Sequence, residues 1–179
     1  MSGTALVVVD MLNPYQHRDA ELLTASVDKM VEPLADLISR AHRADGVELI
    51  YVNDNYGDFT ADRDDIVQRA LDGERSDLVA PIVPSDECIF LTKVRHSAFY
   101  STALDYLLSR RAIRQVILAG QVTEQCILYS ALDAYVRHYS IRVAPDAVAH
   151  IDPDLGAAAL RMMEQNMRTE LTPARYCLE

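Results

Sequence analysis

Three residues with reactive side chains, Asp10, Lys93 and Cys126, each come soon after a short apolar run. A nearby ammonium group and a helix N-terminus both favour the thiolate form of a cysteine, and a carboxylate can accept the thiol proton. The three side chains would therefore form a cysteine nucleophile with a base and a cationic partner, provided that the fold brings them together. Such a group attacks carbonyl carbons.

The apolar runs are typical of strands that are covered on both faces. They are short, rich in β-branched residues and free of polar alternation. We predict strands at residues 5–9, 47–52, 88–92, 115–120 and 141–144. Amphipathic patterns predict helices at about 21–43, 101–111, 126–139 and 153–167.

The alternation of strands and helices predicts a three-layer α/β/α, Rossmann-like domain with a parallel sheet of about six strands. We expect one domain over residues 1–179, because no linker or repeat interrupts the pattern. Ligands of such sheets bind outside the carboxyl ends of the strands. This rule places Asp10, Lys93 and Cys126 at the same edge.

The segment from Asn53 to Pro84 departs from the alternation. It is polar and carries one short helical pattern, at 63–71. Long excursions of this kind often contribute to function, so the segment is either a wall of the pocket or a plain surface insertion.

Composition excludes several classes of protein. The chain of 179 residues has 17 basic and 27 acidic residues, and its net charge of −10 disfavours nucleic acid and anionic membrane surfaces as partners. We find neither a membrane-length apolar run nor a signal-peptide pattern, and we expect a cytoplasmic protein. The three cysteines are too few and too far apart for a disulfide framework. We expect Cys88 and Cys177 to be inert thiols.

Each candidate also has a purely structural interpretation. A cysteine at a strand-to-helix turn is most often a small packed hydrophobe, an aspartate at a strand end can cap a turn, and a lysine usually lies in solvent. Only the combination of Asp10, Lys93 and Cys126 favours catalysis.

The chain resembles the cysteine hydrolases of the isochorismatase-like superfamily. The stretches "ALVVVDMLN", "VELIYVNDN", "TKVRHSAFYSTALDYLL", "VILAGQVTEQCI" and "APDAVAH" follow the family's order over nearly the whole chain. Two spaced motifs carry the resemblance: G-x-x-T-x-x-C at Gly120, Thr123 and Cys126, and K-x-x-x-S-A-F at Lys93, Ser97, Ala98 and Phe99.

The resemblance implies an Asp10, Lys93, Cys126 catalytic triad that acts through a thioester acyl-enzyme. It also implies a cis peptide bond at Val122–Thr123, with the backbone N–H groups of Thr123 and Cys126 forming an oxyanion hole. Asp10 would accept the thiol proton, pass it to the departing amine and later activate water.

The resemblance also bears on the substrate. Isochorismatases proper commonly lack the cysteine, so Cys126 indicates the branch that cleaves amides. Nicotinamidases of that branch hold a metal through an Asp-x-His motif, where this chain reads Asp54-Asn55-Tyr56. We therefore expect no metal and no other cofactor. The expected substrate is a small carbamoyl, ureido or maleamate-type compound.

Residues near the predicted strand ends are candidates for substrate binding. They are Asn13, Tyr15, His96, Phe99, Gln121 and Tyr129. Phe99 and Tyr129 are equally consistent with the core, and His96 with a hydrogen-bonded structural role. Arg95 could bind a substrate carboxylate as a bidentate pair, although an exposed arginine is the simpler interpretation.

Other functions stay open at this point. A vinyl-ether hydrolase of the isochorismatase type, or a catalytically idle interaction protein, would use the same fold. A dinucleotide-binding role is disfavoured because "MLNPYQ" follows the first strand in place of a glycine-rich loop. Relatives are usually oligomers, so we expect a homodimer or homotetramer, with "LDAYVRHY" as a candidate contact.

Overall fold

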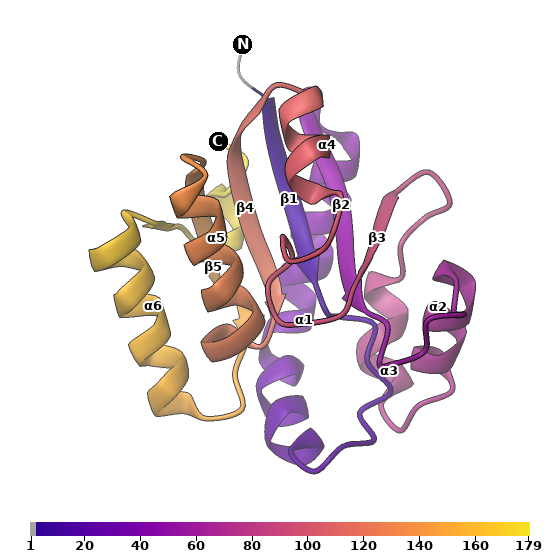
Figure 1. Ribbon diagram of the computed structural model, residues 1–179. Helices are drawn as coiled ribbons and strands as arrows, with labels where there is room; N and C mark the ends of the chain where they lie inside the picture. The colour runs from indigo at the N-terminus through magenta and orange to yellow at the C-terminus, as the bar shows by residue number, and fades with distance from the viewer. Residues whose placement is uncertain (1–2) are drawn as a thin grey trace.

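A computed structural model describes residues 3–179, in which six parallel strands form one sheet of order β3-β2-β1-β4-β5-β6 (Figure 1). The strands are β1 (Gly3–Val9), β2 (Val47–Asp54), β3 (Ile89–Lys93), β4 (Ile113–Gln121), β5 (Ser140–Ala149) and β6 (Glu170–Leu171). This confirms the predicted parallel sheet. The two-residue β6 is too short to produce a recognisable sequence pattern.

Helices cover both faces of the sheet. On one face lie α1 (Ala20–Arg43), α2 (Arg63–Leu71), α3 (Ser76–Val79) and the short turns η1 (Ala80–Ile82) and η3 (Ala174–Tyr176). On the other face, in front of the sheet in Figure 1, lie α4 (Leu104–Arg110), α5 (Leu128–Val136) and α6 (Pro153–Met167). A π-helical turn, η2 (Thr123–Ile127), joins β4 to α5.

The central strand β1 shows how the layers are formed. Its side chains alternate between the two faces, because successive residues of a strand point in opposite directions. Leu6 and Val8 pack into the cluster on the α1 face, whereas Val7 and Val9 pack into the cluster on the α5 face. The strand is buried on both faces, which accounts for its continuous apolar run.

Two predicted helices begin later than expected. The helix predicted at 101–111 begins at Leu104, since Ser101 lies in the left-handed region with φ 54°. The helix predicted from Cys126 begins only at Leu128, and Cys126 lies inside η2. The nucleophile candidate therefore lies in the first helical turn after β4, which continues directly into α5.

The segment between Asn53 and Pro84 is more than a surface insertion. Its first residues complete β2, and Leu78, Val79 and Ile82 are buried on the α1 face. The Tyr51 hydroxyl donates to the Ile82 carbonyl oxygen at 3.0 Å. This segment thus packs against the α1 face of the sheet. No helix among residues 3–179 combines the length and the apolar character needed to cross a membrane.

Candidate active site

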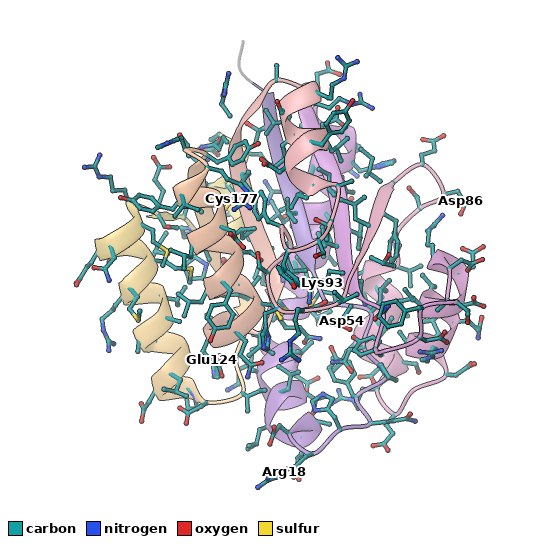
Figure 2. All side chains as sticks on the ribbon, in the orientation of Figure 1. Arg18, Asp54, Asp86, Lys93, Glu124 and Cys177 are labelled. Atoms are coloured by element: carbon teal, nitrogen blue, oxygen red, sulfur yellow. The ribbon has the colours of Figure 1, made fainter. Side chains whose placement is uncertain are left out.

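Asp10, Lys93 and Cys126 meet at the carboxyl edge of the sheet, as the strand-end rule predicts. Lys93 Nζ lies 2.8 Å from Asp10 Oδ2 and 3.8 Å from Cys126 Sγ. Because β1 and β3 flank β2 and η2 follows β4, side chains from distant parts of the chain converge. Figure 2 shows Lys93 in the middle of the molecule, close to Asp54.

The turn after β1 orients the Asp10 carboxylate toward Lys93. Asp10 has a left-handed backbone, φ 54°, which non-glycine residues adopt rarely and often at functional sites. Its Oδ1 accepts the Asp54 N–H at 2.8 Å, and its backbone oxygen accepts a hydrogen bond from the Gln121 side chain at 2.7 Å. The Asn53 side chain further holds the loop by bonding the Leu12 N–H and carbonyl oxygen. Asp10 is therefore held from both neighbouring strands.

Lys93 is a buried cation between two carboxylates. Its side chain is fully buried, 2.8 Å from Asp10 and 3.4 Å from Asp54. Burial acts to lower the pKa of Lys93, but the charges of Asp10, Cys126 and Asp54 outweigh it and raise the pKa. Lys93 is thus an ammonium ion at neutral pH.

Asp54 is a member of the site that the sequence analysis did not assign. It accepts the Tyr56 N–H through Oδ1 and contacts Lys93 through Oδ2. Asp54 ends β2 just as Asp10 follows β1, so the strand-end rule could have identified it.

The state of Cys126 differs from the expected thiolate. Burial raises its pKa to about 12, and the Asp10 charge adds to this, whereas Lys93 lowers it. The resting sulfur is therefore a thiol that interacts with the Asp10 carboxylate. Burial also raises the pKa of Asp10, against the opposing charge of Lys93, which makes Asp10 a better proton acceptor.

The turn that carries Cys126 contains a cis peptide bond at Gln121–Val122, one residue before the predicted Val122–Thr123. Outside proline, a cis bond has no residue-type signature, so sequence spacing could not place it correctly. The Val122 oxygen accepts N–H bonds from Gln125 and Ile127, and the Thr123 hydroxyl donates to the Ala149 oxygen at 2.9 Å. The oxyanion hole at the N–H groups of Thr123 and Cys126 stays a prediction.

Gly120 allows β4 to approach β1 closely just before this turn. Its φ is +116°, and an added Cβ would collide with the backbone oxygen of Val9. A side chain at this position would push β4 away from β1 and displace the turn.

A cavity of about 370 Å³ opens beside Cys126. Of the predicted binding residues, Asn13, His96 and Gln121 line it, and His96 Nδ1 lies 3.9 Å from Cys126 Sγ. Six further residues that no sequence motif indicated also line the cavity, because segments far apart in the chain pack together there: His17, Asp19, Leu23, Tyr56, Gln125 and Ile151.

Three predicted binding residues lie outside the cavity lining. Tyr15 is buried and its hydroxyl donates to Gln121 Oε1 at 3.3 Å. Phe99 is buried in the core on the α5 face. Tyr129 packs edge-on against His96 and lines a neighbouring hollow together with Arg95, which is exposed. The Tyr15 and Phe99 rings are thus buried within the protein, whereas Tyr129 is 43% exposed beside the site.

The isochorismatase domain family matches residues 4–174. The chain belongs to the isochorismatase family. The predicted family is thereby confirmed, and the protein is a hydrolase.

Relatives of this isochorismatase-family protein match it over most of its length. An uncharacterized isochorismatase family protein, YaaI, of Bacillus subtilis is 36% identical, over 98% of this chain and 96% of its own. The ureidoacrylate amidohydrolase RutB of Methylorubrum extorquens is 30% identical, over 90% of this chain and 76% of its own. The crystal structure of N-carbamoylsarcosine amidase from Thermoplasma acidophilum superimposes with a TM-score of 0.74 at 30% identity, covering 96% of both chains.

The region where the sequence suggested a lost metal site holds an ion pair. Asp54 faces Lys93 at 3.4 Å. Within residues 3–179, no three His, Cys, Asp or Glu side chains are grouped so that they could hold a metal ion. The Lys93 ammonium group thus lies between the two carboxylates of the site and offsets one of their two charges.

Proposed function

We propose that this protein is a cysteine-dependent hydrolase that cleaves a C–N amide-type bond of a small carbamoyl, ureido or maleamate-like molecule through a thioester acyl-enzyme. The observation that carries the proposal is the buried contact of Lys93 with both Asp10 and Cys126 beside an open cavity. The activities named for RutB and for the carbamoylsarcosine amidase support cleavage of this bond type.

Acylation begins with the resting thiol. Because its pKa is about 12, Cys126 must lose its proton to Asp10 as the sulfur attacks the carbonyl carbon. The carbonyl oxygen becomes an oxyanion that faces backbone N–H groups of the η2 turn. When the intermediate collapses, the C–N bond breaks and the nitrogen takes the proton from Asp10, which leaves a thioester on Cys126.

Deacylation repeats the proton transfers with water. Asp10, again a carboxylate, takes a proton from water as the oxygen attacks the thioester carbon. The C–S bond breaks, the acid product leaves, and the sulfur regains a proton. Lys93 keeps Asp10 oriented and offsets the negative charge that moves between the carboxylate and the sulfur.

Ammonia release from small primary amides, carbamoyl compounds and ureido compounds tests the activity. A substrate with a good leaving group, or an aldehyde analogue, should add mass to the peptide that contains Cys126 and leave Cys88 and Cys177 unmodified. If Cys126→Ala keeps a substantial fraction of the wild-type rate, the nucleophile is misassigned and the reaction follows a non-covalent mechanism, as in the vinyl-ether hydrolases.

The same reaction should proceed without a metal cofactor, since Lys93 occupies the space between the carboxylates. Activity is measured before and after exhaustive chelation, and again after zinc or iron is added. A loss that only metal restores would contradict this part of the proposal.

We also propose that the chain assembles as a homodimer or homotetramer. Helix α5 exposes four large apolar side chains, Tyr129, Leu132, Tyr135 and Val136, which suits a subunit contact. Light scattering measures the molar mass of the purified protein. A monomer at micromolar concentration would contradict this proposal.

A further inference from the structure

The cavity beside Cys126 is lined by carboxylates and lacks a free strong cation. Asp10, Asp54 and Asp19 all line it, and none of the lining residues that the structure describes is an arginine or a lysine. Lys93 lies behind these residues, but its side chain is fully buried and contacts both Asp10 and Asp54. Its charge is already offset by these two carboxylates, so Lys93 is not free to bind the carboxylate of a substrate.

The arginines near this edge are directed elsewhere. Arg95 lines the separate hollow on the other side of His96. Arg75 pairs with Asp28 and Asp77 on the surface. The Arg18 side chain extends away from Lys93 and Asp54 in Figure 2. The cavity therefore has no guanidinium group to form the bidentate pair by which proteins usually hold a carboxylate.

The remaining polar groups of the lining are weaker partners for an anion. Asn13 and Gln125 are neutral amides, and His17 and His96 are imidazoles. Asp19 lies exposed at the rim, where its charge meets an incoming molecule first. An anion that enters would exchange its hydration for a site with more negative than positive neighbours.

We propose that the cavity selects substrates by charge: it accepts small amides or ureas whose remaining part is uncharged or cationic, and it disfavours those that carry a carboxylate. This inference rests on the proposed function. Within the proposed substrate classes it favours carbamoyl and ureido compounds without an acid group over ureido acids and maleamate. Asp54 and Asp19 repel a carboxylate at the distal end of the molecule and attract an ammonium group.

A set of three amides of similar length tests the selection by turnover. Ammonia release is measured for succinamate, pentanamide and γ-aminobutyramide, which carry a carboxylate, no charge and an ammonium group beyond the amide. We expect kcat/KM for succinamate to be at least about tenfold below that for the other two. If succinamate is hydrolysed as fast as pentanamide or faster, the inference is wrong and amide hydrolysis itself still stands.

Thiol labelling tests the charge of the cavity without turnover. Neutral, anionic and cationic methanethiosulfonate reagents are compared by their rates at Cys126, mapped by peptide mass and normalised to their rates with 2-mercaptoethanol. We expect the cationic reagent to react at least several-fold faster than the anionic one after normalisation, with a smaller ratio in high salt. Equal normalised rates would overturn the inference. A clear cationic preference without hydrolysis of any amide would contradict the proposed function and leave the charge of the cavity established.

A pair of charge-removing variants locates the cause. Asp19→Asn neutralises the rim, whereas Asp86→Asn removes the same charge from the loop before β3, which lies apart from Lys93 and Asp54 in Figure 2 and does not line the cavity. We expect the ratio of cationic to anionic labelling to fall several-fold in Asp19→Asn and to stay unchanged in Asp86→Asn. An unchanged ratio in Asp19→Asn, or an equal fall in both variants, would contradict selection by the cavity.

Discussion

Two cysteines of this protein have similar burial and very different surroundings. Cys126 and Cys177 expose 8% and 1% of their surface, and burial raises their pKa values to about 12 and about 11. Each also has a carboxylate and a cation nearby: Asp10 and Lys93 beside Cys126, and Asp146 and Arg142 close enough to Cys177 to influence its pKa. Burial and nearby charge therefore do not distinguish the proposed nucleophile from a core residue.

The difference is in what the charged groups bind. Around Cys177, Arg142 pairs with Glu170 at 2.9 Å and Asp146 accepts the Ala174 N–H at 2.7 Å. Both residues therefore attach the C-terminal segment to β5. The Cys177 thiol donates to the Thr172 oxygen. Around Cys126, Lys93 contacts both Asp10 and the sulfur, and the sulfur interacts with Asp10, beside a cavity. Cys126 thus differs from Cys177 in two respects: its charged neighbours contact each other and the sulfur, and a cavity gives access to it.

The largest expected effect comes from removing each sulfur. Cys126→Ala should lower kcat/KM by at least about four orders of magnitude, because the nucleophile is lost. Cys126→Ser should be nearly inactive too, since the hydroxyl is far less acidic than a thiol. Cys177→Ala should keep its activity and lose roughly 1 kcal/mol of stability through a small cavity. Steady-state kinetics measures the activity of these variants, and thermal melts measure their stability. An active Cys126→Ala would contradict the proposed difference between Cys126 and Cys177.

Removing each carboxylate is expected to have the next largest effect. Asp10→Asn should lower kcat/KM by roughly 10²–10⁴-fold, because the amide keeps the shape but cannot accept a proton. Asp146→Asn is the matched change near Cys177 and should leave kcat/KM unchanged. A similar loss in both variants would indicate a structural cause, which melting temperatures would reveal.

Removing each cation tests electrostatic catalysis. Lys93→Met should lower kcat/KM by about 10²-fold or more and also lower the melting temperature, since it leaves the buried Asp10 and the partly buried Asp54 without their partner. Arg142→Met should affect stability alone. Near-normal turnover of Lys93→Met would refute the role assigned to Lys93.

The pH profile of Lys93→Met gives a sharper result than its rate. Burial raises the pKa of Asp10 and the Lys93 charge lowers it, so removing that charge raises the pKa further. The base must be ionised to act, and the acidic limb of the kcat/KM profile should therefore move to higher pH in Lys93→Met. It should not move in Arg142→Met. An acidic limb at the wild-type position would exclude Asp10 as the titrating base.

The smallest expected effect concerns a residue that supports Asp10 indirectly. The Tyr15 hydroxyl bonds Gln121, whose amide group bonds the Asp10 backbone oxygen. Tyr15→Phe removes one hydrogen bond and should lower kcat/KM by less than about tenfold. Tyr51→Phe is the control, since it removes a buried hydroxyl bond to Ile82 away from the site. Equal kinetics in the two variants would show that Gln121 holds Asp10 without help from Tyr15.

The sequence by itself determined the sheet and the meeting of Asp10, Lys93 and Cys126. Apolar runs and helical periods are local, and a parallel sheet necessarily brings the ends of its strands to one edge. The motifs around Lys93 and Cys126 identified the family by the same local spacing. These features can be predicted without any knowledge of interatomic distances.

Only the tertiary structure decided the protonation and the surroundings of the site residues. The sequence predicted a thiolate, but burial and Asp10 keep Cys126 a thiol, and the second carboxylate on Lys93 comes from Asp54. The position of the cis bond, at Gln121–Val122, and the exclusion of Tyr15 from the cavity were likewise visible only in the structure. A pKa depends on every charge and on the loss of water around a group, and a cavity wall depends on loops that meet across the fold. Neither quantity is local in the sequence, which is why it predicted the residues of this site but not their protonation or the charge of their cavity.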